Sequence, residues 1–418
     1  MRCRECGKDA PAEGPQYCSW CFGPVEVVLP ASVDPDAARE AIGAGPASLA
    51  RYRPLLPSSL TLDPAGPGWT PLTSEPGLGA AIGVEDLWVK WESANPTGSF
   101  KDRVVEVAVA RGTALGSRVV ACSSTGNLAR ACAAAAARHD MAAVLIVPEE
   151  LDEAAVADLV DRGAVVVSVR GGYDAASRLA AEAASDLEHW AWVNVTLRPW
   201  YELGARTVAW EIAEQLGWAL PDRVAAPVAS GALVRALHEG VTHLVEWGLV
   251  AGPLPRLTAL QPAGCAPVVA AHESGATRVA PLDRPATVAG SLAMGDPPDG
   301  DAVLAAARAS GGVVAEAPEA EILTACDLVA ATTGVGVEPA GGVVVAALAR
   351  LVQQGHIDPA ERVVAVMTGA AAVVSGAGTG SPGGERVVPG GFHAGTIDPS
   401  VSELTTLVPD ELLRRPTN

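Results

Sequence analysis

Apolar segments alternate with helical segments through the middle of the chain, and this alternation limits the fold more than any other feature. Strands are expected at 143–147, 165–168 and 191–195, with helices at 150–162 and 173–187. Strands that alternate with helices form a mostly parallel sheet covered on both faces. Three further apolar segments are also expected to be buried strands: 223–228, 257–260 and 363–367. The chain is therefore predicted to be an α/β protein.

Length and charge narrow the function. A chain of 418 residues can hold two or three domains with large cores. Its formal net charge of −19 argues against nucleic acid or an anionic membrane as a partner. The longest uncharged run, 363–384, is rich in glycine, which predicts a strand and a loop rather than a membrane span. The first residues carry no signal peptide, so a soluble cytoplasmic enzyme is expected.

Four cysteines near the N-terminus have the spacing of a metal site. They read Cys3-x2-Cys6-x11-Cys18-x2-Cys21, and each Cys-x-x-Cys turn can aim two thiolates at one ion. The spacing predicts a closed, structural zinc ribbon. Disulfides and free thiols are the alternatives, and a reducing cytoplasm disfavours disulfides. The remaining cysteines sit in apolar surroundings and are expected to be small core residues: Cys122, Cys132, Cys265 and Cys326.

One lysine has the position that covalent catalysis requires. In Asn95-Pro-Thr-Gly-Ser-Phe-Lys101-Asp-Arg103, a turn ends the preceding apolar run and Ser99 can cap a helix that starts near Phe100. Lys101 then falls in the first helical turn, where the helix dipole favours a neutral amine. A neutral lysine amine is what Schiff-base chemistry with an aldehyde cofactor needs. The alternative is an ordinary solvated lysine.

Two further loops have the form of anion-binding sites. Cys122-Ser-Ser-Thr-Gly-Asn127 lies between an apolar run and an alanine-rich helix, and Ala229-Ser-Gly-Ala-Leu233 lies between the strand 223–228 and a helix. Backbone N–H groups at such helix starts are free to bind anions. An ordinary helix cap and an ordinary tight turn are the alternatives for the two loops.

Several short motifs, in this order, resemble those of the threonine synthases, in the fold type II group of pyridoxal-phosphate (PLP) enzymes. The resemblance extends from about residue 3 to 370, and similar enzymes also carry an N-terminal cysteine segment. The motifs are Asn95 to Arg103, Ser124-Thr-Gly-Asn127, Pro227-Val-Ala-Ser-Gly231, Gln261-Pro-Ala-Gly-Cys-Ala-Pro267, Ser291-Leu-Ala-Met-Gly295, Glu338-Pro-Ala340 and Thr368-Gly369.

This resemblance implies a tryptophan synthase beta-like fold, with two α/β domains and the small cysteine ribbon. The expected division is a ribbon at 1–30, a connector at 31–67, a large PLP-binding domain at 68–110 and 205–390, a small domain at 111–204, and a tail at 391–418. Short helices are expected at 35–43 and 409–414, and residues 376–393 are expected to be irregular.

The resemblance also implies roles for individual residues. Lys101 would be the catalytic residue and would bind PLP, Asn127 would contact the ring hydroxyl, and Thr368 would hydrogen-bond the pyridine nitrogen. The PLP phosphate would bind the loop formed by Ala229, Ser230, Gly231, Ala232 and Leu233. The substrate would be held by Ser99, Ser124, Thr125 and Gly126, with Arg198 and Arg206 as candidates for its phosphate group. A structural salt bridge is the alternative for each arginine.

The implied reaction converts O-phospho-L-homoserine and water into L-threonine and phosphate. Two departures affect the substrate more than the cofactor: Gly204-Ala-Arg206-Thr207 replaces a Gly-Ser-Lys-Thr or Gly-Gln-Lys-Thr motif, and no lysine follows Thr368-Gly369. One alternative is a paralogue that eliminates or replaces a β- or γ-group on another amino acid. Another is a zinc-ribbon binding or regulatory protein without catalysis. A homodimer is one possible assembly, because the sequence does not indicate the oligomeric state.

Overall fold

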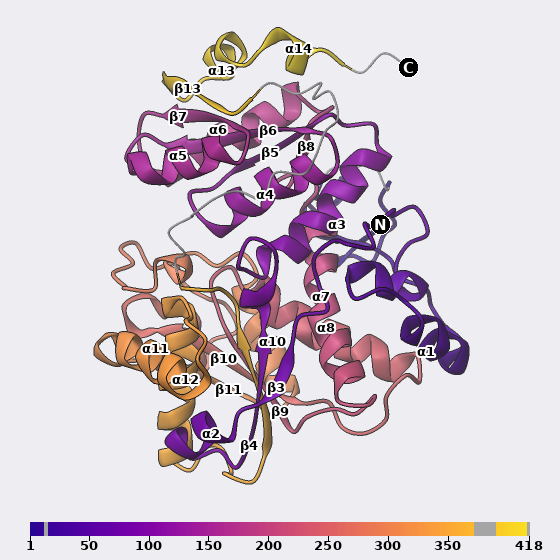
Figure 1. Cartoon of the computed structure of the whole chain (residues 1–418), viewed down its shortest axis with the longest axis vertical. Coiled ribbons are helices and arrows are strands. Elements are labelled where there is room, and N and C mark those ends of the chain that lie inside the picture. Colours follow the sequence, from indigo (N-terminus) through magenta and orange to yellow (C-terminus); the bar gives the residue numbers. More distant parts are fainter. Residues whose placement is uncertain (12–15, 372–389, 416–418) are drawn as a thin grey trace.

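Two parallel-rich sheets lie one above the other along the long axis of the protein (Figure 1). The computed structural model describes residues 1–11, 16–371 and 390–415. An irregular segment was predicted at 376–393. Residues 376–389 of it lie outside the described residues, and only 390–393 can be compared with the structure. The predicted α/β class with parallel-rich sheets is confirmed.

The larger sheet has six strands in the order β11-β10-β9-β12-β4-β3. All neighbours run parallel except β3, which lies antiparallel to β4 at one edge. Its strands are β3 (Leu72–Ser74), β4 (Asp86–Trp91), β9 (Arg223–Pro227), β10 (Arg256–Pro262), β11 (Val313–Ala317) and β12 (Arg362–Met367). The central strands are buried on both faces, which explains why they read as continuous apolar runs.

The smaller sheet has five parallel strands in the order β13-β7-β6-β5-β8. They are β5 (Val119–Ser123), β6 (Ala142–Pro148), β7 (Ala164–Val169), β8 (Ala191–Trp192) and β13 (Phe392–Ile397). Alternate residues of β5 enter two different cores: Val120 and Cys122 on one face, Val119 and Ala121 on the other. Helices therefore cover both faces, as the alternating sequence pattern predicts.

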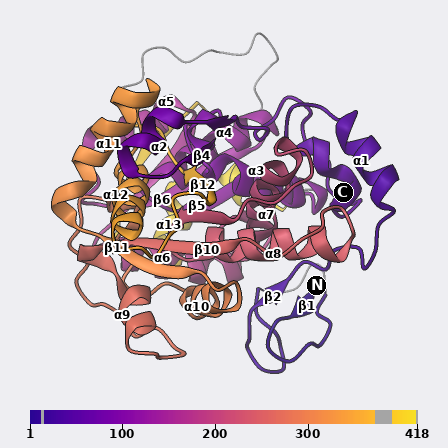
Figure 2. The same cartoon turned by 90° about the horizontal axis from the view of Figure 1, so that it is seen from below.

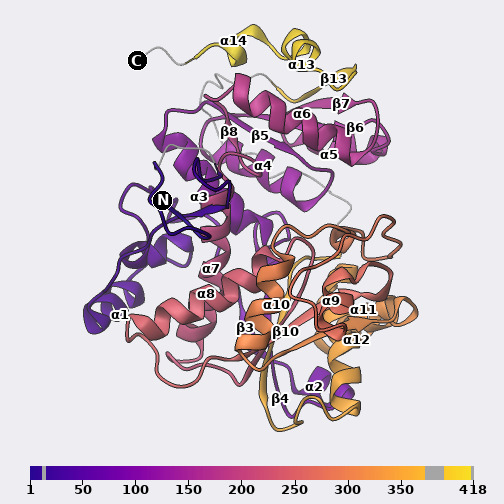
Figure 3. The ribbon, with the colours of Figure 1, turned by 180° about the vertical axis from the view of Figure 1, so that it is seen from behind.

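Helices cover both sheets and fill the space between them (Figure 3). They are α1 (Pro35–Gly43), α2 (Pro76–Ile82), α3 (Lys101–Ala114), α4 (Asn127–Arg138), α5 (Glu153–Asp161), α6 (Tyr173–Asp186), α7 (Arg198–Gln215), α8 (Ala232–Glu246), α9 (Pro267–Glu273), α10 (Gly300–Ala309), α11 (Glu319–Thr333), α12 (Pro339–Gln353), α13 (Val401–Leu407) and α14 (Asp410–Leu413). The helices predicted at 35–43, 150–162 and 173–187 correspond to α1, α5 and α6. The strand predicted at 191–195 is shorter, because the backbone turns after Trp192.

Helices α3, α7 and α8 pack together where the two sheets meet. Two glycines allow this packing. A Cβ on Gly204 of α7 would lie 2.7 Å from the carbonyl oxygen of Arg103, and one on Gly240 of α8 would lie 2.8 Å from that of Arg206. The axis of α7 can therefore approach the axes of α3 and α8 closely. Gly204 allows the contact with the first turn of α3, and Gly240 allows the contact with α8.

Part of the predicted C-terminal tail, the strand β13 at Phe392–Ile397, joins the smaller sheet. Strand β13 pairs in parallel with β7, and α13 and α14 follow it over the same sheet (Figure 1). The Trp190 indole donates a hydrogen bond to the carbonyl oxygen of Leu412 at 2.9 Å, and Ser168 Oγ bonds His393 Nε2 at 2.9 Å. The irregular segment predicted to reach residue 393 was therefore wrong for Phe392 and His393, which lie in β13. Without β13, the edge of β7 would expose unpaired backbone N–H and C=O groups, and β13 pairs with them.

The N-terminal segment forms a two-stranded antiparallel ribbon, β1 (Arg2–Cys3) with β2 (Val25–Glu26). It lies beside α8, as Figure 2 shows, and β2 also contacts α7. Within the described residues no helix is long and apolar enough to cross a membrane.

Candidate active site

Lys101 begins α3 and holds its amine against an aromatic hydroxyl. Its Nζ donates a hydrogen bond to the Tyr201 hydroxyl at 2.7 Å, and the ring centroids of Phe100 and Tyr201 lie 4.7 and 5.4 Å from the same nitrogen. The Ser99 hydroxyl accepts the Lys101 backbone N–H at 3.3 Å. The predicted helix start beside Phe100 is confirmed, and the helix presents an amine that is partly buried. The predicted Ser99 cap was wrong, because Phe100 is the N-cap residue and no side chain caps this helix.

A partly buried carboxylate, that of Glu338, joins two of the residues expected to contact a cofactor. Asn127 Nδ2 donates to Glu338 Oε2 at 2.9 Å, and Thr368 Oγ1 donates to Glu338 Oε1 at 3.2 Å. Burial raises the pKa of Glu338, although these hydrogen bonds and the charge of Lys101 oppose the rise. A Cβ on Gly369 would lie 2.4 Å from the Glu338 carboxyl carbon. Only a glycine therefore leaves room for this side chain.

Three backbone segments hold Lys101, Glu338 and Thr368 together. The N–H of Phe100 donates to the carbonyl of Thr368 at 2.9 Å, and Ser99 pairs with Gly369 in an isolated antiparallel bridge. The N–H of Glu338 donates to the carbonyl of Gly369 at 3.0 Å. The carboxyl end of β12 is thereby tied both to the start of α3 and to the segment that precedes α12.

The loop 124–126 connects β5 to α4 beside this carboxylate. Ser124 and Gly126 are partly buried, Thr125 is exposed, and Asn127 is the first residue of α4. The Gly126 N–H lies 3.5 Å from the Ser124 hydroxyl. Because the first N–H groups of a helix have no partner within the helix, this loop offers donors for an anion next to Glu338.

The loop 229–233 lies at the start of α8 and is supported by Asp299. Gly231 has φ +89°, which a side chain would strain, and a Cβ there would also lie 3.0 Å from the backbone of Asp299. The N–H of Asp299 donates to the carbonyl of Ser230 at 2.9 Å. The Ala232 N–H lies 3.4 Å from the Ser230 hydroxyl. The loop is a tight turn with the N-terminal end of a helix behind it.

Arg198 connects this second loop to Tyr201. Its Nη2 donates to Asp299 Oδ2 at 2.9 Å, its Nε donates to Glu202 at 3.0 Å, and its guanidinium carbon lies 5.3 Å from the Tyr201 ring centroid. Burial alone would raise the pKa of Asp299, but Arg235, Arg198 and Arg4 outweigh it and lower that pKa. Arg4, from the N-terminal ribbon, reaches Asp299 at 3.4 Å and Glu202 at 3.6 Å.

Arg206 lies further along α7 and has different contacts. Its Nη2 pairs with Glu239 Oε2 of α8 at 2.7 Å and with Glu26 Oε2 of β2 at 3.3 Å. The side chain is buried between these two elements. The structure therefore brings Arg198 beside Tyr201, whereas it places Arg206 in contacts between α7, α8 and the ribbon.

A fully buried charge network anchors α3 below Lys101. Arg103 Nε donates to Glu92 Oε2 at 2.6 Å, and its Nη2 donates to Glu211 Oε2 at 2.6 Å. Lys90 Nζ donates to the same Glu211 oxygen at 2.8 Å. Burial alone would raise the pKa of Glu211, but the charges of Arg103 and Lys90 lower it to about 2. Asn95, in the turn before the helix, donates to Glu92 at 3.0 Å.

Known proteins resemble this chain over most of its length. A family model described as pyridoxal-phosphate dependent enzyme matches residues 64–369. The threonine synthase of Methanosarcina acetivorans is 35% identical over 88% of this chain and 91% of its own. That of Methanocaldococcus jannaschii is 32% identical with the same coverage, and that of Mycobacterium tuberculosis is 34% identical over 78% of this chain and 88% of its own.

The chain belongs to the pyridoxal-phosphate dependent enzymes, in the threonine synthase family.

The fold also resembles solved structures of other enzymes. Threonine deaminase isoform 2 from Solanum lycopersicum has a TM-score of 0.64 at 20% identity and covers 88% of this chain and 93% of its own. Maize serine racemase has a TM-score of 0.62 at 20% identity over 82% and 95% of the two chains. At this identity the likeness shows the fold alone. It confirms the predicted fold type.

The site fits the cofactor of the threonine synthase family by the chemistry of its donors. It offers an amine at Lys101, a glycine-containing turn at a helix start for a phosphate, and the Thr368 hydroxyl at the carboxyl end of β12, where open α/β sheets bind ligands. Sequence reasoning missed two members, Tyr201 and Glu338. Glu338 stood in a recognised motif without an assigned role, and Tyr201 gave no signal of its own.

The four N-terminal cysteines converge as the spacing predicts. Their Sγ atoms all lie within 4.8 Å of one another, with Cys3 to Cys21 at 3.5 Å and Cys6 to Cys18 at 3.7 Å. Four thiolates at about 2.3 Å from a tetrahedral zinc ion would be separated by roughly 3.8 Å. The cluster therefore fits a zinc ion. Of the other cysteines, Cys122, Cys132 and Cys265 are buried as expected, and Cys326 is partly buried.

Proposed function

We propose that the protein is a PLP-dependent lyase that converts O-phospho-L-homoserine and water into L-threonine and phosphate. The observation that supports this most directly is the Lys101 amine at the start of α3, hydrogen-bonded to Tyr201, in a chain about one-third identical to threonine synthases. Overall, the substrate loses protons from Cα and Cβ and phosphate from Cγ. It regains protons at Cγ and Cα, and water adds at Cβ.

The residues that would hold the cofactor come from four segments. Lys101 would bind its aldehyde carbon, the loop 229–233 its phosphate, Thr368 its pyridine nitrogen and Asn127 its ring hydroxyl. The Glu338 carboxylate, which already holds Asn127 and Thr368, would orient both side chains. When bound, PLP supplies an electron sink for the charge that develops at the substrate Cα.

The protein's own groups would then position the substrate and move protons. The N–H and hydroxyl groups of 124–126, with Ser99, would hold the substrate carboxylate. Lys101 Nζ would carry protons between the substrate carbons, and the Tyr201 hydroxyl would orient that amine and accept its hydrogen bond. Both arginines are already paired with carboxylates, Arg198 with Glu202 and Asp299 and Arg206 with Glu26 and Glu239. We assign the substrate phosphate to Arg198, because its guanidinium lies beside Tyr201, the partner of the Lys101 amine.

We further propose a structural zinc ion on Cys3, Cys6, Cys18 and Cys21. Four cysteine ligands leave no open position for substrate, so the ion would stabilise the ribbon rather than take part in the reaction. Through Arg4, which contacts Asp299, the ribbon would also support the loop 229–233. Cytoplasmic location, the division into domains and a homodimeric assembly stay predictions; light scattering on the purified protein decides the last.

The test is phosphate release from O-phospho-L-homoserine by the purified, PLP-loaded protein, with threonine identified by chromatography. Lys101→Ala is expected to lose the cofactor absorption and all turnover. O-phospho-L-serine, L-serine and L-threonine serve as competing substrates, because a paralogue with another amino-acid substrate would prefer one of them. A PLP-loaded protein that releases no phosphate from O-phospho-L-homoserine would refute the proposal, as would an active Lys101→Ala variant.

A further inference from the structure

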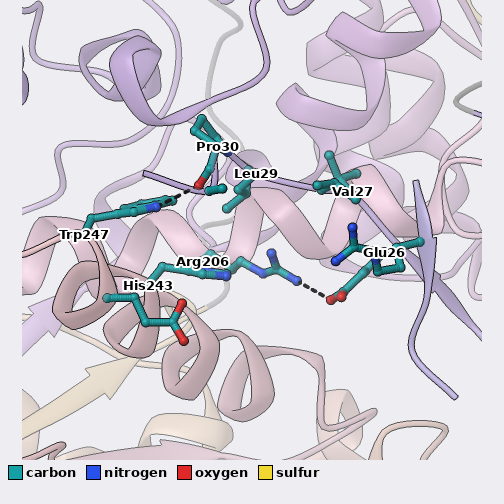
Figure 4. A pocket seen from close by; sticks show the side chains of 11 residues that line it. Glu26, Val27, Leu29, Pro30, Arg206, His243 and Trp247 are labelled. Carbon is teal, nitrogen blue, oxygen red and sulfur yellow. Dashed lines mark hydrogen bonds and ion pairs between the residues drawn. The ribbon is translucent and has the colours of Figure 1, made fainter. Parts of the chain in front are cut away.

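A cavity of about 180 Å³ lies between the N-terminal segment and helices α7 and α8 (Figure 4). Its charged lining consists of Arg2 and Glu26 of the ribbon, Arg206 of α7, and Glu246 near the end of α8. Residues 27–31 supply most of the apolar lining. The cavity is smaller than the ~300–1,000 Å³ typical of drug-sized ligands, so it suits a compact metabolite.

The wall formed by α8 is aromatic and rigid. The His243 and Trp247 rings stack with centroids 5.2 Å apart and planes inclined by 18°. The Trp247 indole donates to the carbonyl of Pro30 at 2.8 Å, which ties the N-terminal segment to α8. Burial first, and then the charge of Arg206, lowers the pKa of His243 to about 4, so the ring is neutral at pH 7. Its Nδ1 has no hydrogen-bond partner among the described residues.

Arg206 gives the cavity a buried cation that is already paired. It is only 2% exposed, and its Nη2 contacts both Glu239 and Glu26, as the dashed line to Glu26 shows in Figure 4. Its Nε has no hydrogen-bond partner among the described residues. A simple anion such as phosphate would meet the Glu26 carboxylate beside this cation. A wholly apolar ligand would remove water from charged groups without replacing their hydrogen bonds, which is costly.

We propose that this cavity binds a small zwitterion, namely an α-amino acid with an apolar side chain. Its carboxylate would face Arg206 and Arg2, and its ammonium group would face Glu26 and Glu246. Its side chain would lie against Trp247 and the apolar residues 27–31. Such a ligand leaves the net charge of the cavity unchanged and gives each charged group a partner.

The same cavity connects to the candidate active site through the two helices that form its wall. Helix α7 carries Tyr201 and Arg198, and α8 begins at the loop 229–233. A ligand that holds the ribbon against α7 and α8 therefore contacts the two helices that carry residues of the candidate active site. Binding itself does not depend on the proposed reaction and is measured without turnover.

The experiment is calorimetric titration of the full-length, PLP-loaded protein with L-valine, L-leucine, L-isoleucine and L-methionine. Saturable binding is expected for at least one of them, and none for N-acetyl-L-leucine, L-leucinamide or inorganic phosphate. Glu246→Ala, an exposed position on the rim, should weaken binding by about tenfold because it removes one charged hydrogen-bond partner. Ala31→Trp, which adds bulk in the lining, should abolish binding.

Glu40→Ala on α1 is the matched control, because it removes an exposed carboxylate outside the cavity. The proposal is overturned if none of the four amino acids binds. It is also overturned if Glu246→Ala and Ala31→Trp bind as tightly as the control. Binding beside Lys101 would change the cofactor absorption and persist in both cavity variants, and that outcome likewise refutes the assignment.

Discussion

Replacing Arg103 by alanine should destabilise the protein strongly, because Arg103 neutralises two buried carboxylates near the start of α3, the helix that carries Lys101. Arg103, Glu92 and Glu211 are all fully buried, and Lys90 is the other cation in the same network. Removing one partner of a buried ion pair typically costs about 3–5 kcal/mol, since the remaining charge stays desolvated. We therefore expect the free energy of unfolding of the Arg103→Ala variant to fall by about this amount.

The loss should be visible as a lower melting temperature. With an unfolding entropy of about 2.1 cal/mol/K per residue, a loss of about 4 kcal/mol in a chain of this length corresponds to roughly 4–6 °C. Differential scanning calorimetry of the cofactor-free protein measures it. Arg256→Ala is the control: Arg256 pairs with Glu361 at 2.8 Å, but its side chain is 55% exposed. That variant should lose less than about 1 kcal/mol.

The reasoning is refuted if Arg103→Ala melts no lower than Arg256→Ala. Arg103→Lys should fall between the wild type and Arg103→Ala, because lysine keeps the charge but cannot form the two-sided fork. The network also predicts an acid response. Because Glu211 has a lowered pKa in the folded protein, its stabilising contribution is complete above its unfolded pKa, about 4.3, and is lost as the pH falls toward about 2.

Three further predictions concern residues around the site. Tyr201→Phe should keep the cofactor absorption but lower turnover by about 10²-fold, because Lys101 Nζ loses the group that orients it; an unchanged kcat would contradict this role. Glu338→Gln should raise the melting temperature of the cofactor-free protein at pH 7 more than at pH 4. Because the pKa of Glu338 is raised in the folded protein, its charged form lowers the free energy of unfolding at pH values above its unfolded pKa. Equal changes in melting temperature at pH 7 and pH 4 would contradict this prediction. Arg4→Ala, and chelation of the proposed zinc ion from the wild type, should both weaken PLP binding severalfold in a fluorescence titration. If both samples bind PLP as tightly as the untreated wild type, the ribbon does not support the cofactor site.

Local patterns in the sequence identified much of the fold and part of the candidate site. The alternation of apolar runs with helical segments located α5, α6 and the buried strands, because burial on both faces makes a parallel strand continuously apolar. The position of Lys101 at a helix start followed from the turn that precedes it, and the cysteine cluster followed from two short spacings. Each of these features depends on neighbours within a few residues or on one repeated turn.

Tertiary packing decided which residues work together. Tyr201 meets Lys101 across 100 positions, Glu338 meets Asn127 across 211, and Arg4 meets Asp299 across 295. No local spacing predicts such pairs, because they depend on how α7 lies on α3 and how the ribbon lies on both α7 and the segment before α10. The same packing drew Arg206 into contacts with Glu26 and Glu239. The sequence therefore determined the candidate reactive groups and the strands, whereas the packing of helices between two sheets decided their partners and created the cavity beside α8.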